Sequence, residues 1–255
     1  MYAVLCQTDT AWEDPLTSHR RIAALLDSEP IAAGSLIVLP EMASTGFSMN
    51  TRATAEPPGG PTESFYSALA KIYQSCILGG VVTEWQGAPR NQAIAVAPGG
   101  QVIARYTKQH PFSPAGESEV YPAGDESVVF EWEGFRVAPF VCYDLRFPEL
   151  FRAAVAQGAT LLAVIANWPS PRQHHWHTLL AARAIENQAI VLGVNRAGTD
   201  PAHTYSGGSQ AFDPQGRSLA KAGEAESLIN IHLKPQDVAR WRAEFPAVRD
   251  AGLPG

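Results

Sequence analysis

Short apolar runs recur along the chain and are separated by polar or amphipathic stretches. The runs are rich in Val, Ile, Leu and Ala and are bounded by Gly, Pro or polar residues, as is typical of strands buried on both faces of a sheet. This pattern predicts strands over 2–7, 35–41, 76–82, 92–97, 102–107, 135–141, 160–166 and 189–195.

Amphipathic stretches with apolar positions three or four residues apart lie between these strands. They predict helices over 15–28, 61–75, 148–157 and 174–188. In the last of them, Trp176, Leu180 and Ala184 are spaced four apart, which gives the helix one core-facing stripe. Pro148 suits a first helical turn, and Gly158 suits a helix end.

Two segments have the pattern of β-hairpins. One is 91–106, around Gly99-Gly100, and the other is 209–221, around the turn at 214–216. No long linker, repeat or low-complexity tract interrupts the chain. The alternation of strands and helices therefore predicts one layered α/β domain over residues 1–255.

Composition narrows the choice of partners more than the choice of fold. The chain is 45% hydrophobic and 17% charged, which is an ordinary make-up for a soluble globular protein. Its net charge of −6, with no run of Lys or Arg, argues against nucleic-acid binding. The Gly-Gly pairs match neither the dinucleotide fingerprint nor a P-loop. We therefore expect a small-molecule partner, no nucleic acid and no cofactor.

The N-terminal sequence and the cysteines bear on location. The first residues have neither the basic region nor the apolar region of a signal peptide, and no apolar run approaches the ~20 residues of a membrane helix. Cys6, Cys76 and Cys142 are widely spaced and odd in number, which fits neither a disulfide framework nor a zinc site. These features predict a cytoplasmic protein without a membrane segment. Cys6 and Cys76 lie inside strand patterns, so we expect them to be buried and inert.

Three polar residues stand immediately after predicted strands: Glu41, Lys108 and Cys142. Active sites of layered α/β folds gather at strand ends and in the loops beyond them. A thiol, a carboxylate and an ammonium are a sufficient set for amide hydrolysis. The sequence therefore predicts a thiol-dependent amidohydrolase.

Each group has a distinct expected role. Cys142 attacks the carbonyl as a thiolate, and we expect the helix N-terminus after it to favour that form. Glu41 takes the thiol proton, delivers it to the leaving nitrogen and later activates water. Lys108 and the backbone N–H of Tyr143 stabilise the oxyanion.

Other interpretations of these residues stay open at this stage. A Cys after an apolar strand is usually a buried, inert thiol, and a lone Glu or Lys is usually solvated or ion-paired. A pair of Cys142 with His110 or His175 is a rival nucleophile–base scheme, but it leaves Glu41 and Lys108 unexplained.

A metal site and a non-catalytic scaffold are further alternatives. His174 and His177 are three apart on a predicted helix, as chelating residues can be. The sequence has no HExxH motif, and a third ligand would have to come from a distant segment, so we expect no metal. A scaffold role is possible because fold does not guarantee function.

At the three candidate residues the chain resembles the nitrilase, or carbon–nitrogen hydrolase, superfamily, whose hallmark is a Glu–Lys–Cys triad. The motifs occur in the family's order: LPEMASTGFSMN (39–50), RYTKQHPF (105–112) and VCYDLRFPELFR (141–152). Lys108 follows Glu41 by 67 residues and precedes the cysteine by 34, which is family-like spacing, and the similarity extends to about residue 233. The resemblance implies a four-layer α-β-β-α sandwich and a homodimer that pairs through its helical layers.

The resemblance also implies a second glutamate between the lysine and the cysteine. In GESEVYPAGD (116–125), Glu117 matches that position by its distance from Ala-Gly-Asp, and Glu119 is the alternative. The implied role of this glutamate is to orient Lys108 and to tune the proton transfers.

Within the superfamily the chain resembles the ω-amidase branch, on the segments 41–50 and 167–200. That branch hydrolyses the terminal amides of α-ketoglutaramate and α-ketosuccinamate to the keto diacids and ammonia, here through a Cys142 thioester. The alternatives within the superfamily are an N-carbamoyl amino acid hydrolase, an aliphatic amidase and a nitrilase. One departure is Gly208, where the branch has an acidic residue, and this leaves the pocket or dimer contact in question.

A keto-acid amide carries a carboxylate at the end away from the scissile bond. Arginine grips a carboxylate through two N–H groups, and Arg172 is the candidate for this contact, with a surface or helix-capping role as its alternative. Phe47 and Trp168 are expected to wall a small pocket, although simple packing is the commoner role of such rings. We expect Arg146 to pair instead with a neighbouring carboxylate, that of Asp144 or Glu149.

Overall fold

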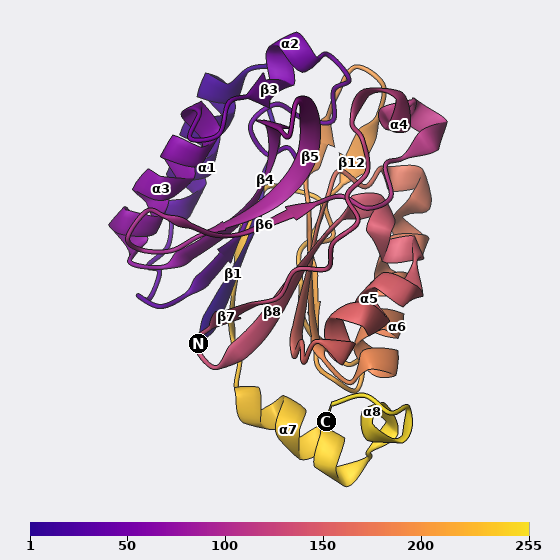
Figure 1. Cartoon of the computed structure of the whole chain (residues 1–255). Coiled ribbons are helices and arrows are strands. Elements are labelled where there is room, and N and C mark those ends of the chain that lie inside the picture. Colours follow the sequence, from indigo (N-terminus) through magenta and orange to yellow (C-terminus); the bar gives the residue numbers. More distant parts are fainter. Residues whose placement is uncertain (255) are drawn as a thin grey trace.

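Two β-sheets pack face to face, and helices cover the outer face of each (Figure 1). The computed structural model describes residues 1–254. The layers follow the order helix, sheet, sheet, helix, which is the order predicted from the sequence. The predicted α-β-β-α sandwich is therefore confirmed.

The first sheet has a parallel centre and antiparallel flanks. Its strand order is β15-β1-β2-β4-β5-β6, and β3 pairs with β4. The strands are β1 (Tyr2–Gln7), β2 (Leu36–Val38), β3 (Ala55–Glu56), β4 (Cys76–Trp85), β5 (Ala88–Val96), β6 (Val102–Thr107) and β15 (Ser227–His232). The helices α1 (Pro15–Leu26) and α3 (Pro61–Tyr73) cover its outer face, as Figure 1 shows.

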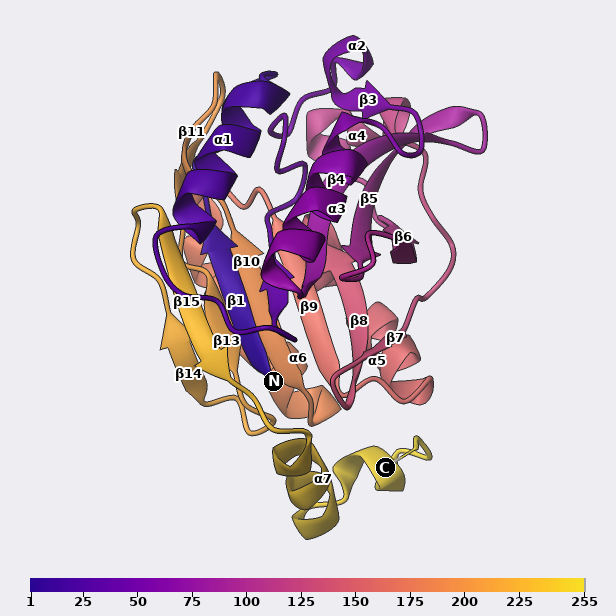
Figure 2. The ribbon, with the colours of Figure 1, turned by 90° about the vertical axis from the view of Figure 1, so that its left-hand side faces the viewer.

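The second sheet has the order β14-β13-β10-β9-β8-β7. Its strands are β7 (Phe130–Trp132), β8 (Phe135–Val141), β9 (Leu161–Ala166), β10 (Ile190–Asn195), β13 (Gln210–Phe212) and β14 (Ser218–Lys221). The outer face is covered by α5 (Pro148–Ala156) and α6 (Gln173–Asn187). Figure 2 shows β8, β9 and β10 side by side behind the strands of the first sheet.

Short elements complete the chain. A two-stranded ribbon is formed by β11 (Ala197–Thr199) and β12 (Thr204–Ser206). The short helices are α2 (Thr51–Thr54), α4 (Glu117–Val120), α7 (Pro235–Glu244) and α8 (Ala247–Asp250). The 3₁₀ turns are η1 (Ser113–Ala115), η2 (Cys142–Arg146) and η3 (Ser170–Arg172). The turns η2 and η3 follow β8 and β9, two inner strands of the second sheet. They therefore place their side chains beyond the carboxyl ends of these strands.

The interior explains why the central strands are continuously apolar. Every residue of β9 is buried, because the strand lies between β8 and β10 and is covered on both faces. A large apolar cluster joins the two sheets to the layer of α5 and α6. A second cluster packs α1 and α3 against the first sheet. Such burial on both faces leaves little room for the alternation of polar residues seen in one-sided sheets.

The predicted helices and the hairpin at 209–221 are confirmed within two residues at their starts and ends, whereas the first strand of the hairpin predicted at 91–106 begins three residues earlier, at Ala88. The predicted strand at 35–41 is shorter than expected and ends at Val38, because Pro40 lacks an N–H and Met42 turns the chain at a φ of 44°. The sequence pattern misses the β4–β5 hairpin, whose turn residues Gln86 and Gly87 have φ of 53° and 82°. It also misses β15 and α7, where few side chains are buried.

Among residues 1–254, no helix is both long enough and apolar enough to cross a membrane.

Candidate active site

Glu41, Lys108 and Cys142 come together at one end of the two facing sheets. Glu41 follows β2, Lys108 follows β6 directly, and Cys142 follows β8 directly. Because β2 and β6 belong to one sheet and β8 to the other, the residues meet across the interface between the sheets. Segments distant in sequence thus supply one compact polar site inside an apolar surrounding.

Lys108 lies between two carboxylates. Its Nζ is 2.8 Å from Glu41 Oε1, and it is 2.8 Å and 3.1 Å from the two carboxylate oxygens of Glu117. All three side chains are buried, with at most 1% of their surface exposed. Of the two glutamates proposed for the second position, the structure places Glu117 in contact with Lys108, whereas Glu119 is exposed.

Two asparagines complete the contacts of Glu41. Asn91 Nδ2 donates to Oε1 of both Glu41 and Glu117, at 2.8 Å each. The backbone N–H of Asn167 donates to Glu41 Oε2 at 2.9 Å, and Asn167 Nδ2 donates to the Glu41 backbone oxygen at 2.8 Å. Sequence reasoning missed both asparagines. Asn167 directly follows the apolar strand β9, so the strand-end rule that selects Glu41, Lys108 and Cys142 could have found it.

The charges of this cluster set the protonation states of its members. Burial raises the pKa of the Glu41 carboxyl, but the Lys108 ammonium and the hydrogen bonds from Lys108, Asn91 and Asn167 outweigh it and hold this pKa below its ordinary value. Burial lowers the pKa of Lys108, and the charges of Glu41 and Glu117 raise it by more, to above its ordinary value. Glu41 is therefore a carboxylate and Lys108 an ammonium at neutral pH.

The thiol of Cys142 has the opposite tendency to the one expected from a helix dipole. Burial, followed by the negative charge of Glu41, raises the pKa of this thiol well above its ordinary value. Cys142 is the first residue of the five-residue 3₁₀ helix η2, and α5 starts only at Pro148, so the helix N-terminus beside the sulfur belongs to a short element with a small dipole. Burial and the charge of Glu41 therefore outweigh the expected effect of the helix N-terminus in the free protein, and the thiol must lose its proton to a base.

The turn that carries Cys142 is held in an unusual backbone conformation. Cys142 has a φ of 49°, in the left-handed region that non-glycine residues rarely adopt. Asp144 fixes this turn, since its Oδ2 accepts from the Val141 N–H at 3.0 Å and from the Tyr106 hydroxyl at 2.8 Å, while its Oδ1 accepts from the His110 N–H at 2.9 Å. Such strain is typical of positions where the side chain must be aimed at a site.

Glu41 is aimed by a close approach of backbone to backbone. A Cβ on Gly80 of β4 would lie 2.6 Å from Glu41 Cα and would also collide with the Met42 nitrogen. Only glycine lets the Glu41 loop lie directly on the sheet at this point.

We therefore expect Gly80→Ala to displace the Glu41 loop, because the added methyl meets backbone that cannot rotate away. The loss of stability should be about 1–3 kcal/mol, as for other overpacked interiors, and activity should fall with it. Thermal unfolding and kcat measure the two effects. Gly223→Ala is the matched control, since a Cβ there meets nothing within 4 Å. Equal behaviour of the two variants would contradict the prediction.

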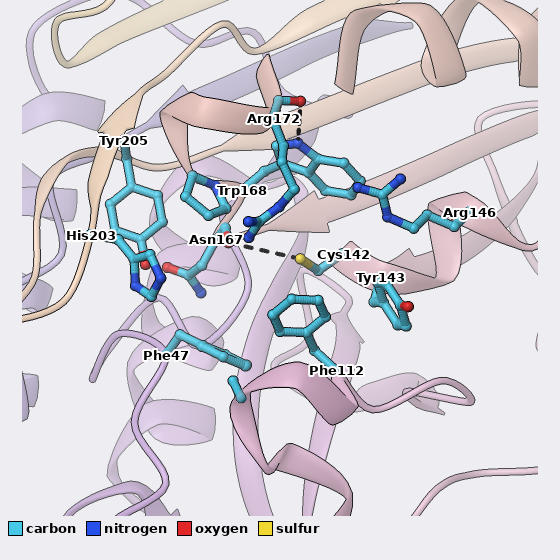
Figure 3. A pocket seen from close by; sticks show the side chains of 12 residues that line it. Phe47, Phe112, Cys142, Tyr143, Arg146, Asn167, Trp168, Arg172, His203 and Tyr205 are labelled. Atoms are coloured by element: carbon cyan, nitrogen blue, oxygen red, sulfur yellow. Dashed lines mark hydrogen bonds between the residues drawn. The ribbon is translucent and has the colours of Figure 1, made fainter. Parts of the chain in front are cut away.

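A pocket that is partly open to solvent lies beside Cys142. Its lining includes Phe47, Trp168 and Tyr143, which sequence analysis assigns to the pocket and the oxyanion site. Arg172 also lines it, with its guanidinium carbon 5.4 Å from the centroid of the Phe112 ring. Figure 3 shows these side chains around the sulfur.

Arg146 also lines this pocket, which corrects its expected role as an ion-pair partner. Its guanidinium carbon lies 4.8 Å from the centroid of Trp168, and its Nη2 is 3.3 Å from His175 Nδ1. Neither Arg146 nor Arg172 forms an ion pair within residues 1–254. The carboxylate of Asp144, one of the expected partners, is occupied by the turn around Cys142.

The remaining predicted positions lie as follows. Cys6 and Cys76 are fully buried in the apolar clusters, as expected, and burial raises the pKa of the Cys76 thiol to about 12. Within the described part of the chain, no three His, Cys, Asp or Glu side chains are grouped so that they could hold a metal ion. Gly208 is not among the residues that line the pocket; it lies against α6, where a Cβ would collide with Gln173 and His177.

Comparison with known proteins agrees with this geometry. The sequence model of the carbon–nitrogen hydrolase family matches residues 3–243. The chain is 41% identical to a protein of Yersinia enterocolitica named omega-amidase YafV, over 96% of this chain and 94% of that protein. It is 33% identical to the 2-oxoglutaramate amidase of Bacillus subtilis, over 96% of this chain and 95% of that enzyme.

A solved structure extends the comparison to three dimensions. The chain superposes with a TM-score of 0.92 on a CN-hydrolase superfamily protein from Xanthomonas campestris that carries an arsenic adduct in its active site. The two sequences are 36% identical, and the match covers 98% of this chain and 96% of that one. The ordered motifs, the four-layer fold and the match over almost the whole length have one explanation: this chain belongs to the carbon–nitrogen hydrolase family.

Proposed function

We propose that the protein is an ω-amidase that hydrolyses the terminal amide of a small dicarboxylic keto-acid monoamide, such as α-ketoglutaramate or α-ketosuccinamate. One observation carries this proposal: the guanidinium groups of Arg146 and Arg172, which have no carboxylate partner among residues 1–254, line the same pocket as Cys142. Arginine binds planar carboxylates through paired N–H groups, so a substrate with a carboxylate at its far end fits this pocket. The names of the relatives in Yersinia enterocolitica and Bacillus subtilis support the same substrate class.

The first half of the reaction forms a thioester. Glu41 takes the thiol proton of Cys142 while Sγ bonds to the amide carbon, and the amide oxygen becomes an oxyanion. Lys108 and the N–H of Tyr143 stabilise that negative charge. When the C–N bond breaks, Glu41 returns its proton to the nitrogen, and ammonia leaves.

The second half restores the enzyme. Glu41 takes a proton from water, and the hydroxide adds to the thioester carbon. The C–S bond then breaks, the sulfur regains the proton from Glu41, and the keto diacid leaves. The net reaction is amide plus water to acid plus ammonia. Because the thiol is neutral and Glu41 is ionised in the free protein, the first proton transfer, from Cys142 to Glu41, can start from the ground state.

Glu117 acts in this scheme through Lys108 rather than on the substrate. Its two oxygens accept from Nζ together with Oε1 of Glu41, so the ammonium keeps a fixed position and charge. Asn91 links the two carboxylates through one NH₂ group and keeps them apart without a second cation.

A substrate panel tests the proposed function. We expect kcat/KM to be highest for α-ketoglutaramate or α-ketosuccinamate, and lower for asparagine, N-carbamoyl amino acids, neutral aliphatic amides and nitriles. Ammonia release measures turnover of the two keto-acid amides, and coupled assays measure turnover of asparagine, the carbamoyl compounds, the neutral amides and the nitriles. A preference for nitriles or carbamoyl compounds would overturn the assignment.

The carboxylate contact makes a separate prediction. Arg172→Ala should raise KM for a keto-acid amide by about ten-fold to a hundred-fold, because charge-assisted hydrogen bonds are lost. KM for a neutral amide of equal length should stay nearly constant, since it has no carboxylate to lose. The exposed Arg20 in α1 provides the control, as Arg20→Ala removes the same charge far from the pocket. An equal rise of KM for charged and neutral amides would refute the contact.

We also propose that the protein is cytoplasmic and forms a homodimer. Both follow from the sequence features and the family resemblance described first. Sedimentation equilibrium at several concentrations tests the oligomeric state, and a monomer at all of them would reject it.

A further inference from the structure

Asn167 presents its side-chain amide in one defined orientation. Its Nδ2 lies 2.8 Å from the Glu41 backbone oxygen and 3.4 Å from Glu41 Oε2. Both of these partners are acceptors only, so the NH₂ group must face Glu41. The side-chain oxygen, Oδ1, must then face away from Glu41.

That oxygen has no hydrogen-bond partner within the described part of the chain. Asn167 is only 4% exposed, and its Oδ1 is among the buried side-chain acceptors left unsatisfied there, as is Oδ1 of Asn91. Buried acceptors are normally paired, and an unpaired one is a reason to look for a ligand. Asn167 lines the pocket that contains Cys142, and in Figure 3 its amide lies between the Cys142 sulfur and the ring of His203.

The backbone ties this acceptor to the reacting atoms. The backbone oxygen of Asn167 accepts a weak hydrogen bond from Cys142 Sγ at 3.8 Å, and its N–H donates to Glu41 Oε2 at 2.9 Å. Asn167 therefore touches both the group that attacks the amide carbon and the group that protonates the amide nitrogen. Its neighbour Trp168 is fixed in turn, because Asn195 accepts from its N–H at 2.7 Å and donates to its carbonyl oxygen at 3.0 Å.

We propose that Asn167 Oδ1 accepts a hydrogen bond from the scissile amide of the substrate and so selects primary amides over nitriles and esters. This inference rests on the proposed function, since it assigns the amide end of the substrate whose carboxylate end faces Arg146 and Arg172. A primary amide has two N–H groups. The nitrogen must approach Glu41 to receive its proton, which brings its second N–H next to Asn167.

The alternatives to an amide leave this acceptor unpaired. A nitrile carries no hydrogen on its nitrogen, and an ester carries an alkoxy oxygen in place of the NH₂ group. A site with a fixed buried acceptor discriminates against a ligand that lacks the matching donor, because the acceptor has already lost water. The buried Oδ1 of Asn167 thus contributes to the selectivity for primary amides over nitriles and esters.

The test compares an amide with the methyl ester of the same acid. In Asn167→Ala, we expect the amide-to-ester ratio of kcat/KM to fall about ten-fold, the effect of one hydrogen bond. Asn91→Ala is the matched control: it also removes a hydrogen bond to Glu41, but Asn91 is not among the residues that line the pocket. Its ratio should change less than about three-fold, whatever its absolute rate.

Several outcomes would overturn the proposal. If the amide-to-ester ratio falls equally in both variants, the effect comes from the lost hydrogen bond to Glu41 and not from Asn167 Oδ1. If the ratio is unchanged in Asn167→Ala, Oδ1 does not contact the substrate amide. Asn167→Ser, whose hydroxyl can still donate towards Glu41, serves if the alanine variant does not fold. The wild-type protein gives a reading without any variant: the matched nitrile should react at least a hundred-fold more slowly than the amide, and equal rates would reject the proposal.

The proposed substrate can fail separately. The ratio is measured both with a carboxylate-bearing pair and with a neutral amide and its ester. If the wild-type protein shows no preference for the carboxylate-bearing pair, the ω-amidase assignment is lost while the Asn167 ratio still stands. If the preference is present and the ratio does not respond to Asn167→Ala, only the Asn167 assignment is lost.

Discussion

Cys142→Ala is expected to lower kcat for amide hydrolysis by a factor on the order of 10⁴ to 10⁶, since loss of the nucleophile alone removes nearly all of the catalytic power of a covalent mechanism. No other described thiol can replace it, because Cys6 and Cys76 are fully buried. Ammonia release under saturating substrate measures the effect. Mass spectrometry of quenched wild-type enzyme should show an acyl adduct that the variant lacks.

The fold should survive this substitution. Alanine is also an L residue, so it keeps the left-handed backbone at position 142 at a similar cost, and it removes only a half-buried sulfur. Cys6→Ala and Cys76→Ala are matched controls that should lose stability and keep activity. Each leaves a small cavity in the core and lowers the free energy of unfolding by about 1–2 kcal/mol. Turnover by a folded Cys142→Ala protein would end the thioester mechanism.

Of the variants considered, Lys108→Met should lower the free energy of unfolding most, and it should also lower kcat strongly. It leaves Glu41 and Glu117 buried without a cation, and removing one partner of a buried ionic group costs about 3–5 kcal/mol. The oxyanion also loses a donor, which lowers kcat by a further factor on the order of 10² to 10³. Lys71→Met, at an exposed position of α3, is the control for loss of a lysine.

The pH dependence separates this mechanism from simple misfolding. In the wild-type protein the pKa of Glu41 is below its ordinary value of 4.5, so its contribution to stability is present above pH 4.5 and is lost as the pH falls. In Lys108→Met the cation is gone and burial raises that pKa, so the variant loses stability as the pH rises above 4.5. Denaturant unfolding between pH 4 and 7 should therefore show a difference that grows with pH. A difference that stays constant would contradict the buried-charge explanation.

The candidate catalytic cluster is predictable because its members share one simple feature. Glu41, Lys108 and Cys142 each follow an apolar strand, and strands of layered sheets end at common edges. The chemistry of the three groups then limits the reactions that they can perform. The resemblance of the flanking motifs supplies the four-layer arrangement, which periodicity alone does not distinguish from other layered α/β folds.

Other parts of the site depend on contacts that a single sequence does not display. Asn91 lies in β5 between Arg90 and Gln92, and nothing local distinguishes it from a solvated asparagine until Glu41 and Glu117 are placed beside it. Arg146 has two acidic neighbours in sequence. The carboxylate of Asp144, however, accepts hydrogen bonds within the turn around Cys142, and the guanidinium of Arg146 lies over the Trp168 ring instead. The strand β15 pairs with β1 across the length of the chain, and its half-exposed face gives only a weak pattern.

The buried cluster of two carboxylates around one ammonium has a consequence for the release of the product. Its formal charge is −1, and the neutral thiol adds nothing to it. An uncharged amide group enters this environment without repulsion, whereas hydrolysis creates a new carboxylate at the same place. Like charges in a buried site repel strongly, so the site expels its own product. In the proposed reaction, the charge that prepares Glu41 as a base thus also speeds the release of the acid product and frees the enzyme for the next cycle.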